Sequence, residues 1–401
     1  MPASPSTARA INDRLALRLL QQEGPLTAGQ LKQLTGLSRP TVADLVERLT
    51  VSGLITVVGE SGEQRRGPNA RLYGIVADRA HLAALDVRTD SVAVTVCDLL
   101  GRELAAASVP IGPDTGTGPA VEQAVTLVER AAKEAGAERL HTVGIGAPGL
   151  IDPATGELRE TTGLPEWHRR LVAALQERLP WARVIVENET NLAALAEQRD
   201  GVARGRDTFV LLWLGHGAGA AVVLDGALRH GASGGTGEIG FLPVPGTGGL
   251  PSATDCAGGF HSLAGSAAVV ELAGAYGLSA AATGREPAAA HLVRAAVRAK
   301  TPRAAEFLDV LADRLALGAA SVVAVLDPGC VVLGGETGRA GGDALAARVA
   351  SRVARMSPLP TQVRASTLGG GAVLRGALLT ARDSAQEILF TPPGPAGPPP
   401  R

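Results

Sequence analysis

The sequence is poor in aromatic residues, in cysteine and in long apolar runs. Aromatic residues make up only 2% of its 401 positions, so the core must be built from aliphatic side chains. The three cysteines have no CxxC spacing, which excludes a disulfide framework and fits the reducing cytoplasm. No apolar run approaches the ~20 residues that cross a bilayer, and the N-terminus lacks the apolar centre of a signal peptide. We therefore expect a cytoplasmic protein without a membrane partner.

The chain also lacks a strong net charge, which is −1 at neutral pH. The charge is unevenly distributed, however. Residues 1–80 contain ten Lys and Arg against seven Asp and Glu, whereas the remainder contains 28 against 32. A mildly basic segment ahead of an acidic body indicates a DNA-binding head. The length exceeds that of one compact core, so two or three domains are expected. The Pro- and Gly-rich tail, 390–401, is predicted to be disordered.

Residues 11–52 contain three helical patterns. The first, at 11–24, is stopped by Gly24-Pro25. The second begins after Thr27, and Gln30 completes a capping box with it. The third begins after Ser38, a favoured cap, and carries Pro40 in its first turn, where proline is tolerated. Its apolar residues recur at helical spacing and predict one buried face: Val42, Leu45, Val46 and Leu49.

Two β-prone runs, at 54–58 and 70–75, follow these helices and flank a loop rich in Gly, Glu and Arg. Three helices and a hairpin with a basic tip predict a winged helix-turn-helix over residues 1–77. Its third helix would enter the major groove, and its wing would contact phosphate or the minor groove. The candidate DNA-binding residues are Ser38, Arg39, Thr41, Asp44 and Arg48 on the helix and Arg65, Arg66 and Arg71 on the wing. Two plainer interpretations stay open, a helical hairpin that binds protein and a solvated charged loop.

A series of strand-like runs occurs twice in the rest of the chain. Alternating runs at 81–87, 91–99 and 101–109 are followed about 125 residues later by similar runs from residue 208 onward. The spacing predicts a duplicated α/β lobe with a cleft between the copies. Ligands of open α/β sheets bind beyond the carboxyl ends of strands. The β-branched run that ends at Asn188 therefore brings Glu189 to a candidate ligand site, although Glu189 also suits the dipole of the helix it begins.

Several stretches together resemble the ROK family, which comprises repressors and sugar kinases. They are GIGAPGLIDPATGEL (144–158), LPEW (164–167), VENETNLAALAE (186–197), LGHGAGAAVVLDG (214–226), TGEIG (236–240) and DPGCVVLGG (327–335). The resemblance implies an α/β body with the two-lobed, actin-like fold of sugar kinases and hsp70, and a sugar bound between the lobes. We place the first lobe at 78–200 and the second at 201–389, with the last helix packing back on the first lobe.

The features that a kinase of this family needs are altered. Family kinases carry an Asp as general base after the Asn of the cleft motif, and here Glu189 follows Asn188. The phosphate-binding DxGxT turn reads DVRTD at 86–90, with Arg88 in place of glycine. The second glycine-rich loop has His216 in place of threonine. The resemblance therefore implies a protein that is not an enzyme. The alternative is an ATP-dependent sugar kinase with an appended DNA-binding head.

The cysteine cluster that binds zinc in many family members is also incomplete. Phe241 stands where the family has a histidine, and only Cys256 and His261 remain as possible ligands. Two ligands do not close a tetrahedral site, so we predict no zinc and no other cofactor. As plainer interpretations, Cys256 is a small buried residue and His261 a hydrogen-bonded loop residue.

The resemblance leaves three polar residues near the sugar hydroxyls, namely Asn188, Glu189 and Glu238. Three interpretations of this cleft stay open: a sugar or sugar derivative binds, a less polar metabolite binds, or nothing binds and the body serves as a dimer scaffold. The first leads to our main hypothesis. The chain would be a transcriptional regulator, a repressor of carbohydrate-related genes, that binds a double-stranded DNA operator as a homodimer or homotetramer and responds to a sugar effector.

Overall fold

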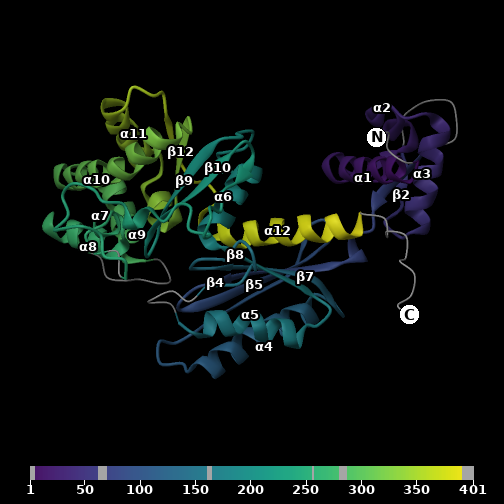
Figure 1. The fold of residues 1–401 in the computed structure, drawn as a ribbon, viewed down its shortest axis with the longest axis horizontal. Helices are drawn as coiled ribbons and strands as arrows, with labels where there is room; N and C mark the ends of the chain where they lie inside the picture. The colour runs from purple at the N-terminus through teal and green to yellow at the C-terminus, as the bar shows by residue number, and fades with distance from the viewer. Residues whose placement is uncertain (1–4, 62–69, 160–164, 255–256, 280–286, 391–401) are drawn as a thin grey trace.

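The computed structural model describes residues 5–61, 70–159, 165–254, 257–279 and 287–390. Figure 1 shows a small head, a first lobe and a second lobe, with helix α12 (Ala372–Leu389) running between them. The fold class predicted from the sequence is confirmed, because a helical head with a small sheet precedes two α/β lobes. Arg65, Arg66, Cys256 and residues 391–401 of the tail lie outside the described residues.

The head combines three helices with a three-stranded sheet. Its elements are α1 (Pro5–Glu23), α2 (Ala28–Thr35), α3 (Arg39–Val51), β1 (Leu26–Thr27), β2 (Ile55–Ser61) and β3 (Ala70–Ile75). The strand order is β1-β3-β2, and both pairings are antiparallel. The sequence does not reveal β1, because two residues carry no alternating pattern. This strand joins the start of α2 to the hairpin and so ties the wing to the helices.

The helix caps predicted for the head are present. Thr27 Oγ1 accepts a hydrogen bond of 3.2 Å from the Gln30 N–H, and Gln30 Oε1 accepts one of 2.9 Å from the Thr27 N–H. Ser38 Oγ accepts a bond of 3.3 Å from the N–H of Thr41 at the start of α3. Each cap gives a hydrogen-bond partner to a backbone N–H that the helix end leaves unpaired. Such a cap stabilises the fold by about 1 kcal/mol. The caps fix where α3 begins and thus which residues its first turn presents.

The first lobe is a five-stranded sheet with two helices on one face. Its elements are β4 (His81–Val87), β5 (Ser91–Asp98), β6 (Glu103–Pro110), β7 (Leu140–Ala147), β8 (Arg183–Asn188), α4 (Thr117–Glu134) and α5 (Trp167–Arg178). The strand order is β6-β5-β4-β7-β8, with β4 antiparallel to β5 and parallel to β7. The central strands β4 and β7 are buried on both faces, as their continuous aliphatic runs indicate.

The second lobe repeats this topology. Its strands are β9 (Phe209–Leu214), β10 (Ala218–Leu224), β11 (Ala227–Leu228), β12 (Cys330–Gly334) and β13 (Gln362–Ala365). Their order is β11-β10-β9-β12-β13, and β9 is antiparallel to β10 and parallel to β12. The duplicated unit predicted from the sequence is therefore confirmed.

Further helices lie between and around these strands. They are α6 (Glu189–Asp200), which leads from the first lobe to the second, and α7 (His261–Ala264), α8 (Ser266–Ala275), α9 (Ala288–Ala299), α10 (Pro302–Leu326) and α11 (Gly335–Met356). Three 3₁₀ turns complete the described elements, η1 (Ala77–Arg79), η2 (Ile239–Phe241) and η3 (Gly369–Gly371). No helix in the described part of the chain combines the length and the hydropathy that a bilayer crossing requires.

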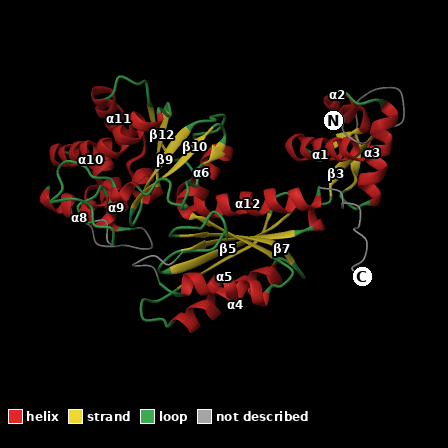
Figure 2. Ribbon diagram, in the orientation of Figure 1, coloured by secondary structure: helices red, strands yellow, loops and turns green. Residues whose placement is uncertain are grey.

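Helix α12 lies across the first-lobe sheet, on the face opposite to α4 and α5 (Figure 2). It packs on β4, β7 and α6. The approach is close because β7 carries glycine at the contact: a Cβ on Gly144 would lie 2.3 Å from the carbonyl oxygen of Ala377. A segment from near the end of the chain thus covers the first lobe. Its far end reaches toward the head in Figure 1.

Candidate ligand cleft and DNA-binding face

Four carboxyl groups gather where strands of the two lobes end. Asp86 is near the end of β4, Glu189 begins α6 after β8, and Glu336 lies in the first turn of α11 after β12. Glu238 follows the loop after β11. Glu189 is close enough to the other three for their charges to raise its pKa. The cleft thus joins residues that are far apart in the sequence because strand ends of both lobes face it.

Arg88 connects two of these acids and, with them, the two lobes. Its Nε donates a hydrogen bond of 3.0 Å to Asp86 Oδ2, and its Nη1 donates one of 2.8 Å to Glu336 Oε1. Burial raises the pKa of Asp86, and the Arg88 charge opposes that shift. Burial also disfavours the Arg88 charge, but both carboxylates outweigh this effect and raise its pKa. Arg88 is therefore the counter-ion of an otherwise acidic cleft.

The turn between β9 and β10, which contains Gly215 and Gly217, contacts the same ion pair. A Cβ on Gly215 would lie 2.8 Å from the Trp213 indole nitrogen and 3.0 Å from Glu336 Oε2. The Gly215 N–H donates to the Gly217 carbonyl oxygen at 3.0 Å. The Glu336 carboxylate thus lies between Arg88 on the first-lobe turn and Gly215 on the second-lobe turn. The bonded side chains of Arg88 and Glu336 thus lie between the two turns.

His168 of α5 supports the first turn from behind. Its Nε2 lies 3.3 Å from the Arg88 carbonyl oxygen, and its ring packs edge-on against Trp167 with centroids 4.2 Å apart. Burial lowers the pKa of His168 to about 4, although the bond to Arg88 opposes the shift. The ring is therefore neutral at physiological pH and donates Nε2–H to the carbonyl. This contact fixes the backbone from which the Arg88 side chain extends.

Glu189 is half-buried and carries an unusual protonation state. Burial, followed by the charges of Asp86 and Glu336, raises its pKa to about 8, and Arg88 lowers it. At neutral pH the carboxyl is mostly protonated, so it can donate as well as accept a hydrogen bond. Its side chain forms no hydrogen bond with another described residue. Glu189 is thus a polar group of the cleft that is open to a ligand.

Asn188 holds the backbone around Glu189. Its Oδ1 accepts from the Thr190 N–H at 2.8 Å as the cap of α6, and its Nδ2 donates to the Gly149 carbonyl oxygen at 2.9 Å. Both ends of the amide therefore have partners within the protein. These bonds hold the backbone next to the cleft, and the contact between Asn188 and a ligand stays a prediction.

A second ion pair crosses from one lobe to the other. Glu187 at the end of β8 lies 2.7 Å from Nε2 of His230, which follows β11. The other oxygen of Glu187 accepts from the Asn188 N–H and from Asn191 Nδ2. The hydrogen bond to Glu187 raises the pKa of His230, and burial opposes it. Closure of the lobes thus includes a pair whose charge depends on pH near neutrality.

The loop that carries Glu238 needs glycine. Gly237 has a φ of +91°, and a Cβ there would lie 1.9 Å from the Ala220 carbonyl oxygen of β10. The tight approach holds the loop against β10 and turns Glu238 toward the cleft. Its side chain is exposed at this edge, and partial burial by the loop raises its pKa. Glu238 is therefore accessible to a ligand that enters the cleft from solvent.

No group of three or more His, Cys, Asp or Glu side chains among the described residues is arranged to hold a metal ion. His261 lies beside Gly217, with its Nδ1 3.7 Å from where a Cβ would stand. Burial lowers the pKa of His261, and the nearby His216 adds to the shift. Cys256 falls outside the described residues.

The candidate DNA-binding residues of α3 divide into two groups. Ser38 and Arg39 at the start of the helix are exposed, and Thr41 is half-buried beside them. Arg48 near the far end donates to Asp13 of α1 at 2.6 Å and is also paired with exposed Asp44. Of the second group, Arg48 ties α3 to α1, and Asp44 pairs with Arg48 on the surface of α3. On the wing, Arg71 is exposed at the start of β3, and Arg65 and Arg66 lie outside the described residues.

The sequence does not reveal the roles of three residues at the contact between the lobes. Glu336 lies in the first turn of α11, just after β12, as Glu189 lies in the first turn of α6, just after β8. This similarity of position is the signal that could have indicated Glu336. The sequence shows Arg88 only as a replacement for a phosphate-loop glycine, because its partner Glu336 lies 248 residues away. His230 has no local signal, since nothing near it in the sequence points to Glu187.

A family model matches most of the body. The model of the ROK family covers residues 82–384. The chain belongs to the ROK family. A second model, of the MarR family, matches residues 11–67 of the head. Residues 68–81, which include β3 of the head, separate the two matches.

ROK relatives include regulators and kinases. The DNA-binding transcriptional dual regulator NagC of Escherichia coli K12 is 26% identical over 244 residues, which are 59% of this chain and 58% of that protein. The chain thus matches little more than half the length of this relative. A crystal structure of a ROK family transcriptional regulator, a homolog of the E. coli MLC protein, has a TM-score of 0.76 at 20% identity. It covers 96% of this chain and 98% of its own, which shows a shared fold.

A kinase of the ROK family shares a smaller part of the chain. The glucokinase from Streptomyces griseus, solved with glucose and AMPPNP, has a TM-score of 0.61 at 26% identity. It covers 76% of this chain and 100% of its own. The ROK body is therefore common to both kinds of protein, and the winged head distinguishes this chain from that kinase.

Proposed function

We propose that this ROK family protein is a DNA-binding transcriptional regulator, a repressor of carbohydrate-related genes, that senses a sugar or sugar derivative between its lobes. The observation that carries the proposal is the Arg88–Glu336 ion pair between the two cleft turns. Nucleotide phosphates would have to enter between these turns, where the side chains of Arg88 and Glu336 are bonded to each other. The cleft is thus suited to binding a neutral polyol and not to phosphoryl transfer.

The head supports DNA recognition. Its third helix begins with a capped and exposed first turn, where Arg39 is free to reach a base edge. Arg71 on the wing is exposed on the same head and suits a phosphate contact. The regulators NagC and the MLC homolog share the family and the fold, respectively. We propose that the protein acts as a homodimer or homotetramer, because paired winged heads match paired half-sites.

The cleft supports the effector. Protonated Glu189 and exposed Glu238 offer hydrogen-bond donors and acceptors to hydroxyl groups. Glu189 begins α6, and α6 packs against α12. A sugar that favours one arrangement of the lobes would shift α6 and α12 and, through them, the distance between the two heads of a dimer. The two heads would then no longer fit the two half-sites of the operator at the same time.

The same residues argue against catalysis. A general base must be ionised when it takes a hydroxyl proton, and the raised pKa of Glu189 keeps it mostly protonated at neutral pH. The Gly215 N–H is already bonded to Gly217, so it does not point freely at a phosphate. We therefore propose that kinase activity has been lost. An ATP-dependent sugar kinase with a DNA-binding head is the second candidate, favoured by the fold shared with the glucokinase.

Two measurements separate these functions. The first incubates the full chain with duplex fragments of its source genome at low ionic strength and sequences those retained. Selective retention is expected, and retention of none would refute the regulator. The second measures ATP consumption with hexoses and N-acetylhexosamines. No turnover above background is expected, and rates of order 1–100 s⁻¹ would establish the kinase instead.

A further inference from the structure

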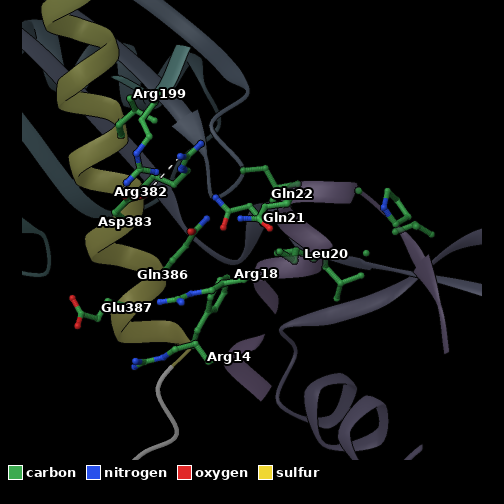
Figure 3. Close-up of a pocket in the computed structure, with 18 of the residues that line it drawn as sticks. Arg14, Arg18, Leu20, Gln21, Gln22, Arg199, Arg382, Asp383, Gln386 and Glu387 are labelled. Carbon is green, nitrogen blue, oxygen red and sulfur yellow. Dashed lines mark hydrogen bonds and ion pairs between the residues drawn. The ribbon is translucent and has the colours of Figure 1, made fainter. Parts of the chain in front are cut away.

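A cavity of about 860 Å³ lies between the head and the body. It shares no lining residue with the interlobe cleft described above. Figure 3 shows its two walls, α1 of the head on one side and α12 with the end of α6 on the other. Four arginines line it, Arg14 and Arg18 on α1, Arg199 on α6 and Arg382 on α12. The cavity thus collects positive charge at the junction of two domains.

The arginines of the body wall compete for its aspartates. Asp383 is shared by Arg199 at 3.1 Å and Arg382 at 3.6 Å, and Asp200 is taken by Arg375 at 2.6 Å. Three guanidinium groups therefore divide two carboxylates. Glu387, a third acid of the lining, has an interaction of its own. With Glu387 the body wall has three acids against Arg199, Arg382 and the neighbouring Arg375, so its charges balance. The extra positive charge of the lining comes from Arg18 on the head, which forms no ion pair with a described residue.

Arg382 has a longer ion pair than Arg199 or Arg375. Its side chain is 14% exposed, and its Nε is buried without a hydrogen-bond partner. Burial lowers its pKa, and repulsion from Arg375 and Arg199 adds to the shift despite the attraction of Asp383. A buried polar atom without a partner costs about 1–3 kcal/mol, so it calls for an explanation. An oxyanion in the cavity would supply the missing acceptor.

The head wall offers complementary groups. Arg18 is exposed on α1 and extends toward α12 in Figure 3, next to Gln21 and Gln22 on the same helix. Gln386 of α12 is already bonded to the Leu99 carbonyl oxygen at 3.2 Å, so the free amides of the lining come from α1. A ligand held by Arg382 from one side and Arg18 from the other would bridge the body and the head.

We propose that this cavity is a binding site for a small phosphoryl-bearing metabolite, held by Arg382 and Arg199 on the body and by Arg18 on the head. Guanidinium groups suit phosphate because their planar N–H forks match pairs of phosphate oxygens. The binding itself does not depend on the proposed function. Its consequence does: by joining α1 to α12 the ligand would fix the orientation of the winged head.

The test titrates the full chain, without DNA, with inorganic phosphate and with pyrophosphate in a calorimeter. Sodium chloride of equal ionic strength serves as the blank. Arg382→Gln and Arg18→Gln should each weaken pyrophosphate binding by about tenfold or more, because each removes charge-assisted hydrogen bonds. Arg18 is exposed, so its replacement leaves folding intact even where Arg382→Gln lowers stability. Arg178→Gln is the matched control, since Arg178 pairs with Glu122 and Glu129 on the first lobe, away from the cavity.

The outcomes are distinct. Binding that both cavity variants weaken and the control preserves supports the site. Absence of heat at about 10 mM pyrophosphate overturns it, as does equal binding by wild type and both cavity variants. If the two variants reduce duplex DNA binding and leave pyrophosphate binding unchanged, the arginines belong to the DNA interface and the metabolite site is refuted. Because no DNA enters the titration, failure of operator binding does not affect the result.

Discussion

Arg88 and Glu336 join the two lobes of the body through a hydrogen bond of 2.8 Å between Nη1 and Oε1. Arg88 extends from the turn after β4, and Glu336 from the first turn of α11. Their side chains are 34% and 18% exposed, so solvent screens the pair only in part. Separation of the lobes would break this contact, and it therefore acts as a closing contact of the cleft.

Replacing Arg88 should destabilise the body. In Arg88→Met the carboxyls of Asp86 and Glu336 lose their counter-ion, which we expect to lower the free energy of unfolding by about 2 kcal/mol. Urea unfolding of wild type and variant measures the difference. Arg102→Met is the control, because Arg102 is 75% exposed in its pair with Asp98 and should change stability by less than about 1 kcal/mol. An equal decrease in the free energy of unfolding in the two variants would show that the interlobe pair stabilises the body no more than an exposed pair does.

The raised pKa of Glu189 predicts a particular dependence of stability on pH. The native carboxyl holds its proton up to a pKa of about 8, whereas an ordinary Glu releases it near 4.5. Between these values the native state binds more protons, so stability falls as pH rises through this window. Glu189→Gln removes the ionisation. The melting temperature of the variant relative to wild type should therefore increase from pH 5 to about pH 8.5, and a constant difference would contradict the assignment.

His230 should make a second pH-dependent contribution to the stability of the fold. Its pKa is raised above the usual 6.5 by Glu187, so the charged pair is fully present below 6.5 and is lost as pH rises through the raised value. His230→Gln should thus cost stability at pH 6 and little at about pH 9. Thermal unfolding across this range checks the sign. His291→Gln on α9 is the comparison, and its effect should not follow the same curve.

Glu238 should matter for the effector and not for DNA. Its side chain is exposed at the cleft, and its loop is held in place by Gly237. We expect Glu238→Ala to keep operator affinity and to abolish the increase in melting temperature that a bound sugar produces in wild type. Thermal shift with a sugar panel and a DNA-binding assay measure the two properties. Loss of folding in this variant would assign the residue a structural role instead.

Arg39 and Arg71 should affect DNA binding in different ways. Arg39→Ala is expected to cost about 1–3 kcal/mol on a specific operator and to relax its sequence preference, since its position suits a base contact. Arg71→Ala should weaken binding to all duplexes and reduce the salt slope by about 1. Arg48→Ala should instead lower the stability of the head, because Arg48 bonds to Asp13. Salt titrations on specific and random duplexes distinguish these results.

The sequence by itself determined the three helices of the head, its hairpin and the repeated strands of the two lobes. The capping box at Thr27, the cap at Ser38, and the helical and alternating runs are local patterns, and local hydrogen bonds and burial enforce them. The duplication of the lobes was visible for the same reason, since each copy repeats its strand pattern. The position of Glu189 at a strand end was likewise readable, because strand ends are where a sheet presents side chains to a ligand.

Only the tertiary structure decided how charges are paired and protonated. Arg88 meets Glu336 across 248 residues and Glu187 meets His230 across 43, and neither pair leaves a local trace. The protonation of Glu189 depends on burial and on acids brought in from both lobes. The arginine-lined cavity exists only where the head rests beside α12. Periodicity reports which face of an element is buried, whereas electrostatics depends on distances that packing alone creates.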